Sequence, residues 1–221
     1  MSKGKLICFI GLDGAGKSTL SKSLQSYFLS KGIKTKIIWV KLGVPIVNIP
    51  KIVYKIMLVF SKSKDKKDSN KSDTSSFKIP ENPIIRKVYL TYILLDHWFQ
   101  ILIKVGMPLI FGYYIICDRY IADSVVDLVA NFDMHYEDAK SILKKFIGIP
   151  KSDYAFYIEV SPEVAFTRKN EGYPLEYLIL KKNIYSKITN DNEFNIITLD
   201  GTLDKDTLFK KVIDLLNQKD V

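Results

Sequence analysis

The segment that most constrains this chain is a glycine-rich loop that stands between an apolar run and a helical pattern. Residues 11–19 read GLDGAGKST and fit the pattern G-x-x-x-x-G-K-[ST]. The preceding run, KLICFIG at 5–11, is typical of a buried parallel strand, and residues 18–30 carry apolar side chains at helical spacing. Backbone N–H groups in such a loop turn inward around phosphate oxygens, and the helix points its positive end at them. The sequence therefore predicts a binding site for a nucleoside triphosphate and Mg²⁺.

The positions of this loop have separate roles in holding phosphate. Its glycines permit the tight turn, Lys17 reaches the β and γ phosphates as a point charge, and Ser18 offers its hydroxyl to Mg²⁺. The predicted ATP-binding residues are Gly11, Gly14, Ala15, Gly16, Lys17, Ser18 and Thr19. The loop alone does not specify a reaction, because GTPases, ATPases and kinases share it.

Basic residues outnumber acidic ones, and the excess lies in the first half of the chain. The 221 residues carry a formal net charge of +9, which suits nucleic acid, an acidic membrane surface or phosphorylated small molecules as partners. Among the 33 basic residues, the arginines, which favour bidentate phosphate contacts, are Arg86, Arg119 and Arg168. Most aromatic residues stand in apolar runs and do not alternate with bases, so nucleic acid is not an expected partner.

The cysteines and the apolar runs bear on the compartment of the protein. Cys8 and Cys117 lie in apolar runs and are expected as small core residues, so nothing indicates an oxidising compartment. The longest uncharged run, 105–117, is too short to span a bilayer. We therefore expect a cytoplasmic protein without membrane contact.

Strand patterns alternate with helix patterns along the chain, which predicts an α/β fold with an open parallel sheet covered by helices on both faces. The expected strands are 5–11, 35–40, 113–117, 154–160 and 194–199. The expected helices are 18–30, 46–60, 84–105, 121–131, 136–147, a segment from 162, 175–189 and 204–218. A Ser-, Lys- and Asp-rich segment at about 61–78 predicts a mobile polar insertion within a single domain, 1–221.

A second motif follows the expected strand at 113–117. The residues Asp118, Arg119 and Tyr120 stand at the carboxyl end of this strand, where a parallel sheet forms its ligand crevice. A carboxylate there can orient Mg²⁺ or accept a proton, and an arginine can grip a phosphate in two places. The alternative interpretation is an Asp-Arg pair that caps the next helix.

These motifs and two further segments resemble the thymidylate kinase family of nucleoside monophosphate kinases. The segments that carry the resemblance are FIGLDGAGKST (9–19), CDRYIADS (117–124), YIEVSPEVAFTRKN (157–170) and IITLDGTLDKDTL (196–208). They stand in the family's order and spacing, so the resemblance covers most of the chain. It implies a P-loop kinase fold with a five-stranded parallel sheet, a donor site for ATP·Mg²⁺, and an acceptor monophosphate held opposite for in-line transfer.

The resemblance also implies roles for individual residues, with dTMP as the expected acceptor and dTDP as the product. The implied catalytic residues are Lys17, Asp118, Arg119 and Arg168. The implied Mg²⁺ ligands are Ser18 and Asp118. The implied acceptor-binding residues are Asp13, Lys41, Tyr92, His97, Arg119 and Tyr120. A short lid is expected at about 169–178, and the helix at 84–105 resembles in position the family's dimer-forming helix, so a homodimer is expected.

Several positions depart from the family's pattern, mostly in the acceptor site and the lid. Where the family has Arg-Glu-Pro-Gly, this chain has KLGV at 41–44, so a lysine replaces the arginine that meets the acceptor phosphate. The family's Tyr-Gln is replaced by Asp127-Leu128. The lid region has no arginine, and the bases available there are Lys169, Lys181 and Lys182.

The sequence leaves alternatives open for single residues and for the whole protein. Asp13 could merely help the turn to form, Arg168 could be a solvated base on a helix, and Asp96-His97 could be a surface pair. The same fold could act on a nucleoside, a sugar phosphate or another small acceptor. A basic nucleotide-binding interaction protein at a membrane is a further alternative, because 42–60 is apolar with two lysines and a lysine-rich stretch follows.

Overall fold

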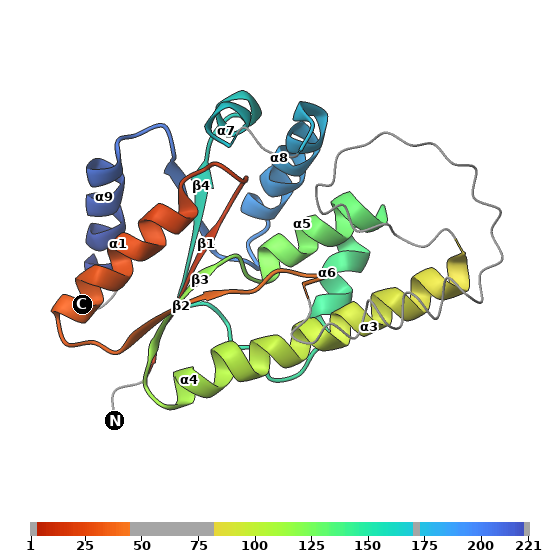
Figure 1. Cartoon of the computed structure of the whole chain (residues 1–221), viewed down its shortest axis with the longest axis horizontal. Coiled ribbons are helices and arrows are strands. Elements are labelled where there is room, and N and C mark those ends of the chain that lie inside the picture. The colour runs from red at the N-terminus through yellow and green to blue at the C-terminus, as the bar shows by residue number, and fades with distance from the viewer. Residues whose placement is uncertain (1–3, 45–81, 170–172, 219–221) are drawn as a thin grey trace.

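Five parallel strands form the centre of the computed structural model, which describes residues 4–44, 82–169 and 173–218 (Figure 1). The strands are β1 (Leu6–Ile10), β2 (Thr35–Trp39), β3 (Tyr114–Asp118), β4 (Tyr154–Glu159) and β5 (Ile196–Asp200). Their order across the sheet is β2-β3-β1-β4-β5. The chain leaves β1 toward one edge of the sheet and later crosses to the other, so the carboxyl ends of β1 and β3 form a topological switch point, where ligands bind in open α/β sheets.

Helices cover both faces of this sheet. They are α1 (Lys17–Ser30), α3 (Pro83–Ile101), the π-helical turn η1 (Leu102–Gly106), α4 (Met107–Ile110), α5 (Ile121–Phe132), α6 (Tyr136–Lys144), α7 (Pro162–Arg168), α8 (Leu175–Thr189) and α9 (Lys205–Gln218). On β4, the Tyr154 hydroxyl donates to the carbonyl of Leu216 in α9, while the Tyr157 ring stacks on Tyr185 of α8. Side chains alternate along a strand, so α9 and α8 lie on opposite faces of the sheet. Figure 1 shows α1 beside α9, and α5 beside α8.

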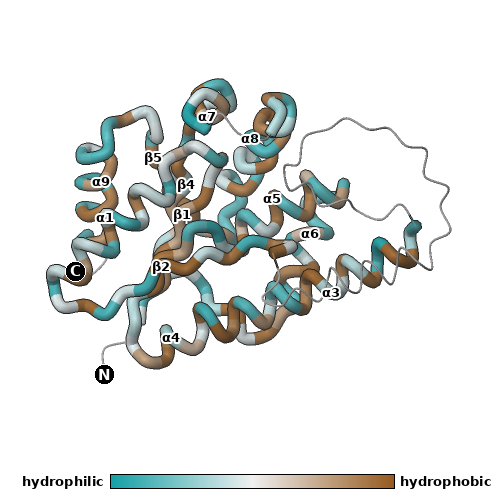
Figure 2. Tube along the Cα trace, in the orientation of Figure 1, coloured by the Kyte–Doolittle hydropathy of each residue, from teal (hydrophilic) through white to brown (hydrophobic). Residues whose placement is uncertain are grey.

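The core lies where the central strands meet these helices. All five residues of β1 are buried, which explains the uninterrupted apolar run LICFI in the sequence. Phe9 of β1 stacks on Phe156, its register partner in β4, with 5.6 Å between the ring centroids. Figure 2 shows the hydrophobic colour concentrated on the central strands. The buried strands therefore form a rigid base for the loops that follow their carboxyl ends.

The segments α3, η1 and α4 form one continuous helix, Pro83–Ile110. Its start is capped by Asn82, whose side-chain oxygen accepts hydrogen bonds from the backbone N–H groups of Ile84 and Ile85. Among the described residues it is the one helix whose length and apolar composition would suffice to cross a membrane, a test that the core helix of a soluble protein also passes. Of the 18 consecutive residues in this helix that are most apolar, 33% are buried inside the structure.

The predicted α/β fold with a five-stranded parallel sheet is confirmed, and each strand begins and ends within two residues of its expected bounds. The helix expected at 84–105 is longer, because the π-helical turn and α4 continue it to Ile110. The helix expected at 46–60 and the polar insertion expected at 61–78 lie outside the described residues.

Candidate active site

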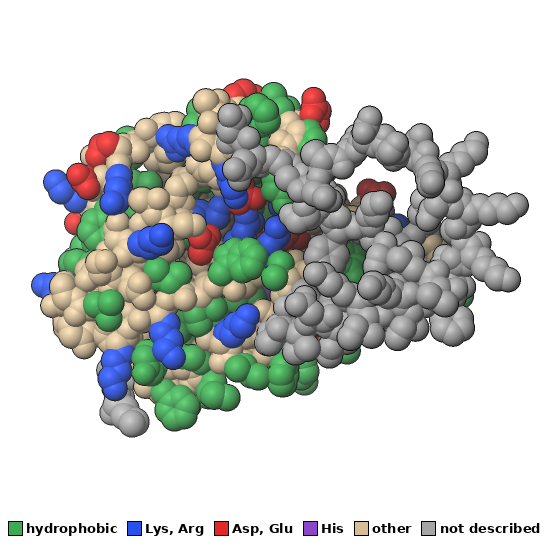
Figure 3. Space-filling model, viewed as in Figure 1, with side chains coloured by type: hydrophobic (Ala, Val, Ile, Leu, Met, Phe, Trp, Pro, Cys, Tyr) green, Lys and Arg blue, Asp and Glu red, His purple; other side chains and the backbone are tan. Residues whose placement is uncertain are grey.

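The phosphate loop joins the carboxyl end of β1 to the start of α1. Gly14 and Gly16 have φ angles of 92° and 95°, in the left-handed region that favours glycine. A Cβ atom on Gly14 would lie 2.5 Å from the carbonyl oxygen of Ala165, so no side chain fits there. The loop borders a cavity of about 600 Å³, and Figure 3 shows basic and acidic side chains gathered in this hollow. The described residues that line it are Asp13, Gly14, Gly16, Lys17, Ser18, Thr19, Trp39, Lys41, Asp118, Arg119, Arg168, Lys169 and Tyr173.

Lys17, the first residue of α1, is buried inside the loop. Its Nζ donates to the carbonyl oxygens of Gly11 and Leu12, at 2.9 and 2.7 Å. Burial, followed by the charge of Arg119, lowers the pKa of Lys17 to about 8, although Asp13 acts in the opposite direction. The ammonium is therefore mostly charged at neutral pH and is held where the loop would enclose phosphate oxygens.

Arg119 connects the end of β3 to the phosphate loop. Its φ angle is 83°, uncommon for a residue with a side chain, and its backbone N–H donates to the carbonyl of Phe9. The guanidinium forms an ion pair with Asp13 and lies 3.8 Å from Asp123. Burial raises the pKa of Asp13, but Arg119 and Lys17 outweigh it and hold the pKa of that carboxyl well below its usual range. Both partners of the pair are therefore charged at neutral pH.

Asp123 and Tyr185 support Arg119 from the core. Asp123 Oδ2 accepts a hydrogen bond from the backbone N–H of Tyr120 at 3.1 Å. The Tyr185 hydroxyl lies within hydrogen-bond distance of Asp123 Oδ1 and, at 3.1 Å, of the carbonyl oxygen of Gly11. Buried contacts thus link α8, the phosphate loop and the turn after β3, which fixes Arg119 before any ligand binds.

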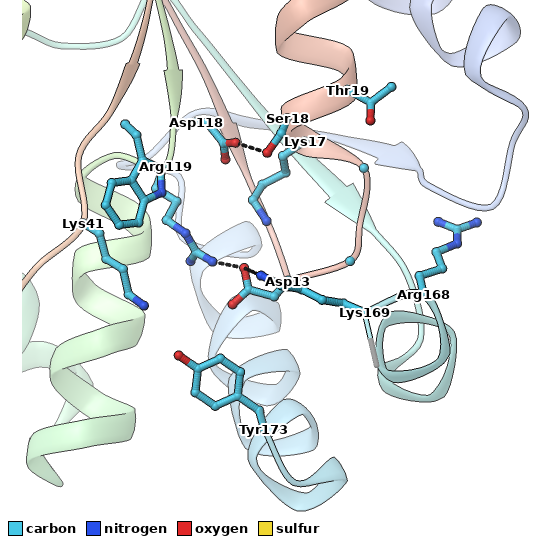
Figure 4. A pocket seen from close by; sticks show the side chains of 13 residues that line it. Asp13, Lys17, Ser18, Thr19, Lys41, Asp118, Arg119, Arg168, Lys169 and Tyr173 are labelled. Atoms are coloured by element: carbon cyan, nitrogen blue, oxygen red, sulfur yellow. Dashed lines mark hydrogen bonds and ion pairs between the residues drawn. The ribbon is translucent and has the colours of Figure 1, made fainter. Parts of the chain in front are cut away.

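Ser18 and Asp118 are hydrogen-bonded neighbours at the start of α1 and the end of β3 (Figure 4). Both offer oxygen atoms, which Mg²⁺ prefers, and Mg²⁺ commonly takes only one or two protein oxygens beside substrate phosphates. Among the described residues, no cluster of three or more His, Cys, Asp or Glu side chains is arranged to hold a metal. The pair therefore fits the Mg²⁺ of a nucleotide–metal complex.

Lys41 and Arg168 mark opposite sides of the cavity in Figure 4. Arg168 Nη1 donates to the carbonyl oxygen of Gly201 at 2.9 Å, so this guanidinium lies at the rim beside the turn after β5. Lys169 instead extends toward the loop, with 3.8 Å between its Nζ and Asp13 Oδ1. Of these two neighbouring bases, Lys169 is thus the one directed at the centre of the cavity.

Three of the predicted acceptor contacts, Tyr92, His97 and Tyr120, are not among the described residues that line the cavity. His97 is 1% exposed, and its Nε2 lies 2.7 Å from the hydroxyl of Ser124. The Tyr120 hydroxyl donates to the carbonyl oxygen of Pro150 at 2.8 Å. Tyr92 is a half-buried residue of α3. Their contact with an acceptor stays a prediction.

The other predicted site residues come together around the loop, and the cavity adds residues that the sequence did not assign. Gly11 and Ala15 are buried parts of the loop backbone, and the remaining predicted residues line the cavity. The additional lining residues are Trp39, Lys169 and Tyr173. Trp39 had a signal in the sequence, because it stands two residues before Lys41 at the end of a strand, where alternate side chains share a side.

A buried ion pair joins α5 to α8. Asp127 of α5 and Lys181 of α8 form an ion pair with 2.7 Å between Oδ1 and Nζ, and their exposed fractions are only 3% and 4%. Burial lowers the pKa of Lys181, but Asp127 outweighs it and raises the pKa above the ordinary value for lysine. Removing either partner would leave a buried charge without compensation, so the two positions depend on each other.

Comparisons with known proteins find low similarity over most of the chain, and no protein-family model matches it. A probable thymidylate kinase 2 of Saccharolobus solfataricus is 26% identical over 222 residues, covering 90% of this chain and 89% of that protein. A thymidylate kinase of Blochmanniella pennsylvanica is 23% identical over 209 residues, covering 90% and 88%. A thymidylate kinase of Plasmodium falciparum is 25% identical over 189 residues, covering 83% and 75%. The similarity covers most of the chain, and it supports a P-loop kinase fold.

Proposed function

We propose that this protein is an ATP-dependent nucleotide kinase, which transfers the γ-phosphate of ATP to a nucleoside monophosphate, with dTMP as the first candidate. The observation that carries the proposal is the Asp13–Arg119 pair, which joins the phosphate loop to the turn after β3 inside one cavity. A donor phosphate chain on the loop and an acceptor phosphate on the Lys41 side would meet at this pair. The similarity to thymidylate kinases supports the same choice.

The transfer needs positioning and charge compensation more than covalent chemistry by the protein. A phosphate oxygen of the acceptor attacks the γ-phosphorus, and the bond from this phosphorus to the β–γ bridging oxygen breaks, which yields ADP and a nucleoside diphosphate. Lys17 holds the phosphates of the donor, Arg119 neutralises charge on the transferring group, and Asp13 holds the guanidinium in place. Bound Mg²⁺, held through Ser18 and Asp118, would compensate the charge of the β and γ phosphates.

A coupled assay of ADP release over a panel of nucleoside monophosphates tests this proposal. We expect release only with an acceptor present and the highest kcat/KM with dTMP. Lys17→Met should abolish release, whereas Lys22→Met, at an exposed position of the same helix, should leave it unchanged. A wild-type protein whose ADP release no monophosphate stimulates would contradict the proposal.

A second candidate keeps the chemistry and changes the acceptor. It is favoured by the buried ion pair between Asp127 and Lys181, because Asp127 stands where the thymidylate kinase family has Tyr-Gln. Sugar phosphates and free nucleosides in the same ADP-release assay separate this candidate from the first. A preference for either class over every nucleoside monophosphate would favour it.

We also propose that the protein is a homodimer in which α3 packs against a second copy. Exposed apolar side chains recur along this helix at positions one or two turns apart, among them Val88, Leu95, Phe99 and Ile103. Such a stripe on one helix exceeds the scattered apolar residues of an ordinary surface. A helix of the same kind on a second copy would cover it.

A further inference from the structure

Trp39, the last residue of β2, presents a large aromatic ring to the cavity. The residue is 48% exposed and lines the cavity. An exposed indole at the mouth of a charged cavity leaves apolar surface in water, where a ligand with a flat ring could cover it.

Trp39 and Lys41 reach the cavity from the same side of the chain. Val40, between them, is fully buried and packs in the core on the other side. This alternation follows from the extended backbone at the end of β2, which places side chains two residues apart on one side. An ammonium group and an aromatic face are therefore presented together, a combination that suits a phosphate joined to a planar ring.

The position of Trp39 in the sheet assigns it to the acceptor end of the cavity. The strand β2 is an edge of the sheet, separated from β1 and its phosphate loop by β3. The other end of the cavity is formed by Thr19 and Arg168, the latter on α7 after β4. A donor bound along the loop toward Arg168 would lie away from Trp39, so the ring that reaches Trp39 belongs to the second substrate.

We propose that Trp39 stacks on the planar ring of the acceptor, so that the acceptor is a base-bearing nucleotide and not a sugar phosphate. The inference rests on the proposed kinase function, because that function assigns one end of the cavity to the donor and the other to the acceptor. Tyr173, which stands just before α8, is the other aromatic side chain among the described lining residues, and its ring is stacked on Tyr177. The structure shows no aromatic partner of Trp39 among the described residues.

Trp39 also borders a shallow surface groove with Ile38 and Ile103. Stacking of a base on an aromatic ring is worth about 1–3 kcal/mol, which corresponds to a change in affinity of about 5- to 150-fold.

The intrinsic fluorescence of a single-tryptophan protein tests the stacking directly. The chain has two tryptophans, and Trp98 lies away from the cavity, with its Nε1 bonded to the carbonyl of Ile147 and its ring stacked on Phe146. In Trp98→Phe the remaining signal comes from Trp39. We expect dTMP to quench it, and ribose 5-phosphate and a non-hydrolysable ATP analogue to leave it unchanged.

Two substitutions of Trp39 add a second readout. In the ADP-release assay, Trp39→Ala should raise KM for the monophosphate about 5- to 150-fold, with KM for ATP unchanged. Trp39→Phe, which keeps a ring, should stay close to wild type, and thermal unfolding checks that both variants fold. Quenching by ribose 5-phosphate or by the ATP analogue alone, or equal KM values for Trp39→Ala and wild type, would overturn the inference. If no monophosphate is phosphorylated, the proposed kinase function fails. Quenching of Trp39 fluorescence by dTMP but not by ribose 5-phosphate does not depend on turnover, so it still tests the stacking separately.

Discussion

Arg119, which is buried, and Asp13, which is half-buried, form an ion pair that fastens the turn after β3 to the phosphate loop. Arg119 occupies a left-handed backbone conformation, and a residue with a side chain keeps it only where surrounding contacts hold it. The contacts here are the pair itself, Asp123 and the carbonyl of Phe9. Strain at this position is thus offset by a network that orients the guanidinium toward the place where phosphate would bind.

Asp13→Ala is expected to cost both stability and activity. Among the described residues, the change leaves Asp123 as the remaining charged partner of a buried guanidinium, so the free energy of unfolding should fall by about 3 kcal/mol. Activity should fall about 100-fold, because the guanidinium is no longer fixed. Urea unfolding and the ADP-release assay measure the two effects. Asp138→Ala, an exposed carboxylate of α6, is the control, and equal behaviour of both variants would refute the prediction.

Nucleotide affinity should depend on the ionisation of Lys17. Because the pKa of its ammonium is lowered to about 8, the charge that meets the phosphates is lost above that pH. The dissociation constant of a non-hydrolysable ATP analogue should therefore rise with pH above about 8 and approach a tenfold increase per pH unit. Calorimetric titration from neutral to alkaline pH measures it. In Lys17→Arg, whose guanidinium stays charged, affinity should be independent of pH in this range. A flat profile for wild type would count against the role of Lys17.

Ser18 and Asp118 should determine the requirement for Mg²⁺. Chelation of divalent cations with EDTA should abolish ADP release by the wild type, and added Mg²⁺ should restore it. Ser18→Ala should raise the Mg²⁺ concentration for half-maximal activity by about 10-fold or more, because an oxygen ligand is lost. Ser23→Ala removes an exposed hydroxyl from the same helix and should not change the Mg²⁺ requirement. Identical Mg²⁺ curves for Ser18→Ala and Ser23→Ala would exclude Ser18 as a ligand.

His97 should make the fold sensitive to acid. Burial lowers the pKa of this imidazole to about 4, below its unfolded value of about 6.5. The unfolded chain therefore binds the proton more readily between these values, and the free energy of unfolding should fall by about 3 kcal/mol as pH falls from 6.5 to 4. Urea unfolding against pH should show a smaller fall for His97→Gln. His135→Gln, at an exposed position, should keep the wild-type profile. A profile unchanged by His97→Gln would contradict this account.

The oligomeric state should depend on the exposed face of α3. Light scattering at micromolar concentration should give the mass of a dimer for the wild type. Phe99→Glu places a charge in the middle of the apolar stripe, where the side chain is 55% exposed, and should give a monomer. Leu29→Glu, at an exposed position of α1 on another side of the sheet, should remain a dimer. A wild-type monomer would contradict the proposal.

The strands and the motif after β3 could be predicted from the sequence, but the role of Arg86 could not. The pattern of apolar runs indicated every strand of the sheet. For β1, β3 and β4 the reason is burial on both faces, which makes a strand a continuous run of apolar residues. The second-motif residues Asp118 and Arg119 were found because they follow such a run. Arg86 had no assigned role in the sequence, and it donates to the carbonyl of Phe132, so it joins α3 to α5. No local pattern shows this contact, because its partner is a backbone carbonyl far along the chain.

The sequence by itself determined the parallel sheet, the phosphate loop and the set of charged residues at its edge, because each depends on neighbouring residues along the chain. Only the tertiary structure decided which distant charges meet: Asp127 with Lys181, Asp13 with Arg119, and Lys169 in place of Arg168 beside the loop. It also placed Trp39 at the cavity and His97 in the core. These outcomes depend on how helices from separate parts of the chain pack around the sheet, and no spacing within one segment encodes them.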